Sequence, residues 1–375
     1  MRKRDVPELA SPEAAHGGMY RTKAFPFVSE GAVYCFGLRE HLAEPSIPRG
    51  ESAVSALLAL RSGTVFGIAT GERAHLLYFH PAFGVTHVGA LGDRRAEGGA
   101  LLDLGGHRLL GGWWGPEGGG LFRHSTNAEE AQGLEQFRGA RSEIDRIARP
   151  TGVGGIAALA GPTAEGAAYG LTLPEGHLVC IAGERPRVQV LARVADAAPT
   201  LVALPDGRLL GACAEGRLWT YCPGEGRLEA LDAHAPCQKG KRHVAGVRSL
   251  LLAGEGLVFG GTSVDGYLFS FDPASGAVAN LGKPCRQSHL RALGQGRDGA
   301  IFGVAEEPQG MARLFRYDAG GVGFTDLGLL SAAFPECWTA HSVGSLAIGP
   351  SGEVYLGETD ALSHLFVYYP PVQRA

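Results

Sequence analysis

The sequence predicts an all-β fold, a seven-bladed β-propeller of four-stranded blades that is closed by an N-terminal strand. Two observations on the chain point to this fold. Glycine is abundant, with 58 among 375 residues, and 45% of the residues are apolar, so the chain can bury a large core. An apolar strand–turn–strand unit also recurs along the chain at intervals of about 40 to 60 residues, which is typical of propeller blades.

Each unit consists of an apolar strand, a tight polar turn and a second apolar strand that ends in glycine. Turns such as "PDG" (205–207) and "GEG" (254–256) contain the glycine that a hairpin turn needs for its positive φ. The units cover residues 56–67, 100–112, 156–170, 200–211, 249–261, 291–303 and 344–357. They predict the first two strands of seven blades.

Further strands follow most of these units. A third strand alternates aromatic and polar residues, as in 75–81, 217–224, 267–276, 312–320 and 364–371. A fourth strand follows in 85–91, 187–194, 227–233 and 277–283. The last unit has no fourth strand, and we expect residues 24–38 to supply it, because such closure removes the open edge of the ring. Residues 24–375 are then one domain, preceded by a tail over 1–23.

Composition excludes several classes of function. The net charge is −4 and only 19% of the residues are charged, which argues against a nucleic-acid partner. No uninterrupted apolar stretch is long enough to span a membrane. The basic start lacks the apolar region of a secretory signal, and the seven scattered cysteines include no CxxC. We therefore expect a cytoplasmic protein with reduced thiols, either monomeric or dimeric.

Three histidines precede the innermost strand in the last three units. His243, His289 and His341 lie in loops that a propeller gathers at one end of its channel. Neutral imidazoles there would bind a divalent metal such as Mn, Zn or Ca, with oxygen from Gln287 or Glu358 completing the shell. Alternatively, each histidine caps its own loop by bonding to a backbone carbonyl.

Two arginines occupy equivalent positions on the innermost strands of neighbouring blades. Arg248 and Arg291 would bind a carboxylate or sulfate, a task suited to the planar guanidinium. Charged groups on this strand are costly unless they are paired. The alternative is therefore a salt bridge, and the candidate acidic partners are Glu306, Asp360 and Asp265.

Aromatic residues at the same end are candidates for substrate binding, together with one arginine. The five candidates are Trp113, Trp114, Trp338, Arg73 and Tyr20. Their faces would stack on sugar rings or on another flat ligand. The alternative for the tryptophans is packing between blades, and in the adjacent pair we expect one packed ring and one exposed ring. Tyr20 belongs to a segment that either folds over a channel end or forms a tail.

With these residues the chain resembles the seven-bladed propeller lyases, which include oligogalacturonate lyase, ulvan lyase and virginiamycin B lyase. Gln287, His289 and His341 match the late-blade His and Gln ligands of oligogalacturonate lyase. His341 and Glu358 match the His–Glu pair of virginiamycin B lyase.

The resemblance implies a carbon–oxygen lyase that acts on a uronic-acid-containing, anionic saccharide by β-elimination. His289 or His341 would remove the proton α to the carboxylate. Arg248 and Arg291, or a metal, would stabilise the negative charge that develops.

Two other functions fit the predicted fold. One is a non-enzymatic scaffold that binds a protein or glycan, because fold alone does not give function. The other is a calcium-dependent hydrolase of lactonase type, which needs several acidic ligands on separate blades. Its candidate ligands are Asp265, Glu306, Glu358 and Asp360.

Overall fold

The computed structural model describes residues 28–38, 47–80, 84–126, 144–163, 166–308, 310–334, 337–360 and 362–371. Regular structure in these residues is almost entirely β. The only helical turns among them are two short 3-10 turns, η1 (Ala214–Gly216) and η2 (Arg242–Val244). None of these residues belongs to a helix that is long and apolar enough to cross a membrane.

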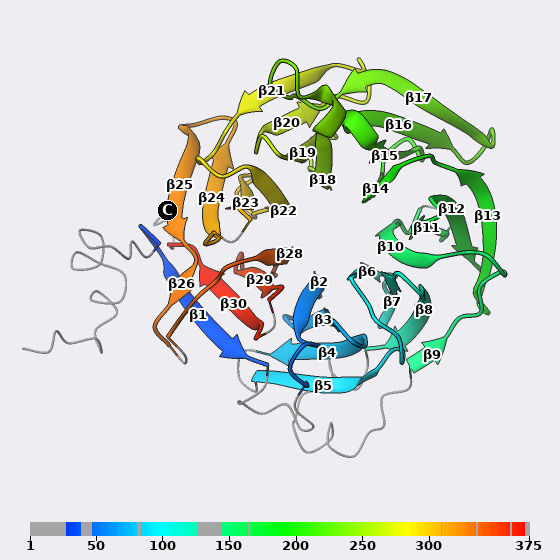
Figure 1. The fold of residues 1–375 in the computed structure, drawn as a ribbon, viewed down its shortest axis with the longest axis horizontal. Helices are drawn as coiled ribbons and strands as arrows, with labels where there is room; N and C mark the ends of the chain where they lie inside the picture. The colour runs from blue at the N-terminus through cyan, green and yellow to red at the C-terminus, as the bar shows by residue number, and fades with distance from the viewer. Residues whose placement is uncertain are drawn as a thin grey trace, which may run out of the picture.

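The described strands form seven four-stranded antiparallel sheets arranged in a ring, which confirms the predicted propeller (Figure 1). The first three blades are β2 (Ala53–Ala59), β3 (Val65–Thr70), β4 (His75–His80), β5 (Gly84–Ala90); β6 (Gly98–Asp103), β7 (Arg108–Gly115), β8 (Gly118–Ser125), β9 (Ile144–Arg146); and β10 (Gly155–Ala160), β11 (Ala168–Leu173), β12 (His177–Ala182), β13 (Arg187–Arg193). Within each blade we call the strands a to d, from the channel outwards.

The remaining blades repeat this order. They are β14 (Ala197–Ala203), β15 (Leu209–Cys213), β16 (Arg217–Cys222), β17 (Arg227–His234); β18 (Gly246–Leu252), β19 (Val258–Ser263), β20 (Leu268–Phe271), β21 (Val278–Gly282); β22 (His289–Gln295), β23 (Ile301–Glu306), β24 (Arg313–Asp318), β25 (Gly323–Leu329); and β28 (Val343–Ile348), β29 (Val354–Glu358), β30 (His364–Tyr369) with β1 (Ala32–Gly37). A two-stranded sheet of β26 (Ser331–Ala332) and β27 (Trp338–Thr339) lies in the connection to the seventh blade.

The N-terminal strand closes the ring. β1 pairs antiparallel with β30, from Ala32 opposite Tyr369 to Gly37 opposite His364. It is the outermost strand of the seventh blade, as Figure 1 shows. The predicted closing segment began at residue 24, and residues 24–27, like the predicted tail 1–23, lie outside the described residues.

The hydrophobic core lies between blades, with one buried cluster at each of the seven interfaces formed by the described strands. At the interface of the seventh and first blades, for example, Tyr355 and Leu365 join Val65 and Phe79 in one cluster, and all four are fully buried. Because the ring is stabilised at every interface, its inner loops are held in fixed relative positions.

In four of the seven blades the glycine that ends the repeat unit makes room for a ring from the neighbouring strand, and in the other three it lies against smaller side chains. In β19, Gly260 lies opposite Phe269 of β20, and a Cβ added to Gly260 would lie 2.2 Å from Phe269 Cζ. Gly303 in β23 stands in the same relation to Phe315 in β24, at 2.4 Å. The repeated glycine in the sequence therefore marks close packing inside the blade, against an aromatic ring in four of the seven.

Candidate functional site

The candidate site is built from irregularities in strand a. In five blades the register between strand a and strand b shifts at the same place, so that one residue of strand a has no partner on strand b. A β-bulge of this kind redirects the side chain of the extra residue. The five extra residues are Ser55, Ala157, Arg248, Arg291 and Gly344, and all five line one pocket of about 640 Å³. We call it the channel pocket.

Arg248 and Arg291 are thus brought together, as the sequence predicted from their equivalent positions. Each is the third residue of its strand, not the second as the sequence suggested. Their roles differ, because only Arg291 has an acidic partner. Its Nε lies 2.5 Å from Oε1 of the buried Glu306. Glu306 Oε2 also accepts the Val343 N–H at 3.0 Å, so this carboxylate ties Arg291 to strand a of the next blade.

Arg248 has no ion pair or hydrogen bond in the part of the chain that the structure describes. The carboxylates that the sequence offered as partners are held elsewhere. Asp265 accepts the Gln238 N–H at 2.8 Å and lies 3.5 Å from Lys241 Nζ, and Asp360 accepts the Leu362 N–H at 2.7 Å. Arg248 is exposed as a residue, but the protein around its guanidinium and the positive charge of Arg291 lower its pKa, against the opposing charge of Glu306. An anion bound in the pocket would relieve this repulsion.

His289 does not line the channel pocket itself but lies on the same strand as Arg291, two residues before it. It begins β22 opposite Glu306, and the equivalent residues of two other blades, Ala53 and Ser342, line the pocket. Burial lowers the pKa of His289, and the charges of Arg291 and Arg248 lower it further. Its Nδ1 is buried without a hydrogen-bond partner. The imidazole is therefore held in its neutral form, which can accept a proton.

His341 and Glu358 serve a different purpose from the one predicted. Glu358 is fully buried and accepts hydrogen bonds from Trp338 Nε1 at 3.0 Å and from the backbone N–H of His341 at 3.1 Å. It also lies 2.9 Å from His364 Nδ1. The side chain of His341 is exposed. Glu358 is therefore a structural carboxylate that holds the loops of the seventh blade.

The predicted metal ligands are not assembled into a site. In the described ranges, no group of three or more His, Cys, Asp and Glu side chains is arranged to hold a metal ion. The set His243, His289, His341, Gln287 and Glu358 fails for local reasons: His243 is exposed on η2, His341 is exposed, and Glu358 is occupied. Gln287 Oε1 is buried without a hydrogen-bond partner.

The calcium site of a lactonase-type hydrolase is not assembled either. Its candidate ligands Asp265, Glu306, Glu358 and Asp360 each accept hydrogen bonds from backbone N–H groups of nearby loops or of the neighbouring blade. At least one oxygen of each carboxylate therefore holds a loop in place, whereas Asp265 Oδ1 is buried without a hydrogen-bond partner among the described residues.

The aromatic candidates separate into packed and open positions. Trp113 is 5% exposed and packs in the interface of the first two blades, whereas Trp114 is half-buried and lines the channel pocket. The packed ring expected for one of the two tryptophans is thus Trp113, while Trp114 is half-buried and not fully exposed. Trp338 is held by Glu358 and stacks on His364, with ring centroids 4.4 Å apart. Tyr20 lies outside the described residues.

Arg73 does not line the channel pocket. It lies in the loop after β3, where its Nε is 3.2 Å from both carboxylate oxygens of Glu51. Glu51 also lies 2.5 Å from Nε2 of the buried His75, whose Nδ1 lies 3.1 Å from His87 Nε2. The sequence did not indicate this chain of Arg73, Glu51, His75 and His87, because its members are far apart in the repeat.

Sequence reasoning also missed three charged residues of the channel pocket, Glu72, Arg95 and Glu97. Glu72 lies in a b–c loop, and Arg95 and Glu97 lie in the loop that enters β6. The rule that placed the histidines, which uses loops entering strand a, would have found Arg95 and Glu97 if it had been applied to the second blade.

No family model matches the chain, and no curated protein matches it by sequence. The fold is similar to several solved propellers. A catalytically inactive virginiamycin B lyase from Staphylococcus aureus with quinupristin has a TM-score of 0.66 at 7% identity, over 91% of this chain and all of that one. A streptogramin B lyase has a TM-score of 0.63 at 10% identity, over 90% of this chain and 98% of that one. The WD40 β-propeller domain of Doa1 has a TM-score of 0.59 at 15% identity, over 91% of this chain and 97% of that one. At these identities the likeness establishes the propeller fold alone.

Proposed function

We propose that the channel pocket binds an anionic saccharide and that the protein is a carbon–oxygen lyase, cleaving a uronic-acid-containing chain by β-elimination. The lyases among the similar propellers support the reaction class at a coarse level. The observation that carries the proposal is Arg248, a guanidinium in the channel pocket that has no acidic partner among the described residues.

A carboxylate is the ligand group that best fits this pocket. Arg248 and Arg291 project from equivalent bulges of neighbouring blades, and the Arg291 charge is already balanced by Glu306. Arg248 is then the guanidinium of the channel pocket without an acidic partner among the described residues, while Arg95 pairs with Glu97 at 4.0 Å and Glu72 adds a negative charge to the lining. A guanidinium binds a carboxylate through two parallel hydrogen bonds, which fixes its orientation as well as its position.

The proposed reaction uses His289 as the base. Its neutral imidazole removes the proton on the carbon next to the substrate carboxylate, and the electron pair of that C–H bond forms the new C=C bond. The C–O bond on the next carbon breaks, and the leaving oxygen takes a proton from water. Arg248 stabilises the negative charge that the carboxylate gains before the C–O bond breaks. No step is assigned to a metal, because the predicted ligands do not form a site.

Two substitutions test binding and chemistry separately. Arg248→Met should weaken binding of galacturonic acid by about 30-fold or more, since a charged partner is lost, with binding measured by calorimetry. His289→Gln should leave this affinity within about twofold and reduce cleavage of oligogalacturonate by at least about a hundredfold, followed by the ultraviolet absorbance of the unsaturated product. Arg187→Met removes a charge from the exposed strand β13 and is the matched control.

Two outcomes would contradict the proposal. Unchanged uronate affinity in Arg248→Met would overturn the assignment of the pocket. Uronate binding without cleavage of any uronate-containing chain would overturn the lyase and support the non-enzymatic scaffold.

A further inference from the structure

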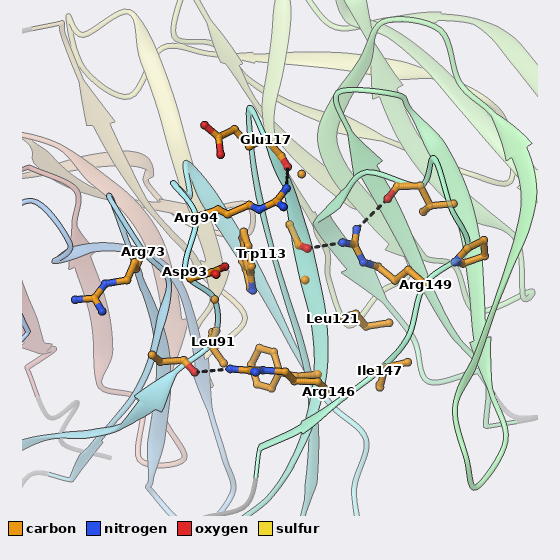
Figure 2. Close-up of a pocket in the computed structure, with 18 of the residues that line it drawn as sticks. Arg73, Leu91, Asp93, Arg94, Trp113, Glu117, Leu121, Arg146, Ile147 and Arg149 are labelled. Carbon is orange, nitrogen blue, oxygen red and sulfur yellow. Dashed lines mark hydrogen bonds between the residues drawn. The ribbon is translucent and has the colours of Figure 1, made fainter.

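A second pocket lies beside the channel pocket, between the first three blades. It encloses about 810 Å³ and is lined by loops that enter β6 and β10 and by the turn between β7 and β8. We call it the flank pocket. Figure 2 shows three guanidinium groups, those of Arg94, Arg146 and Arg149, turned towards its middle around Trp113. The Arg73 guanidinium points away from Trp113 and is bound to Glu51.

Backbone carbonyls, not carboxylates, hold the three arginines in place. Arg94 Nη1 donates to Glu117 O at 2.9 Å, and Arg146 Nη2 donates to Ala90 O at 3.4 Å. Arg149 donates to Val153 O at 3.0 Å and also to the carbonyls of Gly154 and Gly119. A neutral carbonyl orients a guanidinium but leaves its charge uncompensated, so each arginine remains available to an anion.

The acidic residues of the flank pocket do not neutralise these arginines. Asp93 and Glu117 line the pocket, but in the described ranges neither carboxylate lies within 4.0 Å of an arginine nitrogen. Figure 2 shows the carboxylate of Glu117 turned away from the middle of the pocket. The charge of the nearby Glu175 acts on Arg149, so the positive charge that is open to an anion lies mainly on Arg94 and Arg146, neither of which has a carboxylate partner among the described residues.

The flank pocket and the channel pocket share one wall. Asp93 and Arg94 line the flank pocket, and the next residues, Arg95 to Glu97, line the channel pocket. The adjacent tryptophans are divided in the same way, with Trp113 on the flank side and Trp114 on the channel side. Since consecutive Cα atoms are about 3.8 Å apart, a single layer of chain separates the two pockets.

We infer that the flank pocket is a second anion subsite, which binds a further acidic group of the same saccharide chain that enters the channel pocket. The inference rests on the proposed function and adds to it that the substrate is polyanionic and longer than one sugar. One carboxylate binds at Arg248, and the chain crosses the shared wall so that a second carboxylate lies among Arg94, Arg146 and Arg149. Two linked contacts of this kind increase affinity without any change at either site.

The test compares galacturonic acid with a short oligogalacturonate and with a neutral oligosaccharide of the same length, using calorimetry. The variant is Arg94→Met with Arg146→Met. Both side chains are exposed and each makes one hydrogen bond to a carbonyl, so the fold should be retained. The matched control is Arg185→Met with Arg187→Met, which removes two exposed charges from the d-strand side of the third blade.

The native protein should bind the oligogalacturonate on the order of tenfold more tightly than the monomer, and bind the neutral chain weakly. The double variant should lose that tenfold gain and bind the monomer as the native protein does, whereas the control should retain both. If the double variant keeps the gain while Arg248→Met abolishes monomer binding, the second subsite is wrong and the proposed function stands. If Arg248→Met leaves monomer binding unchanged while the double variant weakens the oligomer, the flank pocket binds the anion and the proposed function is wrong.

Discussion

Single residues decide which polar groups of this propeller are structural and which are available to a ligand. Glu306 and Glu358 are each the last residue of strand b in their blades, and each accepts a backbone N–H at the channel end, from Val343 and His341 respectively. Arg248 lies on the same face but has no such partner among the described residues. A buried carboxylate with its bonds made stabilises a loop, whereas an accessible guanidinium without an acidic partner is available to bind one.

The role of Glu358 predicts a large loss of stability in Glu358→Gln. The amide nitrogen of glutamine cannot accept, so either the His341 N–H, which is bonded to Oε1, or the His364 N–H, which is bonded to Oε2, loses its partner. The free energy of unfolding should fall by about 3 kcal/mol in urea titrations. Glu184→Gln, at an exposed position, is the control and should change it by less than about 0.5 kcal/mol. Equal stability of the two variants would refute the structural role.

The pair His75–His87 predicts a pH dependence of stability. Burial lowers the pKa of His87, and the neighbouring His75 and Arg73 lower it further, against the opposing effects of the Gly89 backbone and of Glu51. The pKa of His87 in the folded protein lies below its ordinary value of about 6.5, so unfolding takes up a proton between these two values. The contribution of His87 to the free energy of unfolding is therefore complete above about pH 6.5 and is lost as the pH falls towards the pKa of the folded state.

His87→Gln should therefore show a smaller loss of stability than the native protein between about pH 7 and pH 5, measured by denaturant unfolding. The free energy of unfolding of the variant should still depend on pH in this range, since burial also lowers the pKa of His80, His234 and His289. Identical slopes in the two proteins would contradict the assignment. Burial raises the pKa of Glu51, but hydrogen bonds from His75 and Arg73 outweigh this effect and lower it. Glu51 therefore titrates below this pH range.

At the scale of the strand, two features recur among the blades. In four blades strand b carries a glycine that receives a ring from strand c, and in five blades strand a carries a bulge whose extra residue lines the channel pocket. The glycine was visible in the sequence because only one residue type leaves the needed space. The bulge was not visible, since serine, alanine, arginine and glycine all occupy it.

The packing of strand b predicts that Gly260→Ala will be destabilising. The added methyl would meet the Phe269 ring at 2.2 Å inside a buried blade, so the ring or the strand must move. We expect a loss of about 2 kcal/mol in the free energy of unfolding. Gly224→Ala is the matched control, because a Cβ there meets no atom within 4 Å. Comparable losses in the two variants would show that the ring contact is unimportant.

At the scale of the whole molecule, closure of the ring holds both pockets together. β1 completes the seventh blade, and an apolar cluster joins that blade to the first. Removing residues 1–40 should therefore abolish cooperative thermal unfolding, because the seventh blade loses its outer strand and the interface beneath it. Removing only residues 1–27 leaves β1 intact and is the control. Unchanged melting of the shorter chain would show that closure does not depend on this strand.

The sequence by itself determined the propeller, the number of blades and the source of the closing strand. These features depend on local signals, namely the alternation of apolar residues, turn glycines and the glycine opposite each ring, which a strand carries within its own residues. It also placed Arg248 and Arg291 at equivalent positions, because equivalence follows from the repeat.

Only the tertiary structure decided which polar residues meet. The predicted metal ligands were grouped by their loops, yet Glu358 accepts bonds from its own blade and the His341 side chain faces solvent. Arg94 and Arg95 are neighbours in sequence but line different pockets. Distances between blades depend on bulges and on the curvature of the closed ring, which have no residue signature, so contacts between residues of different repeats cannot be read from the repeats themselves.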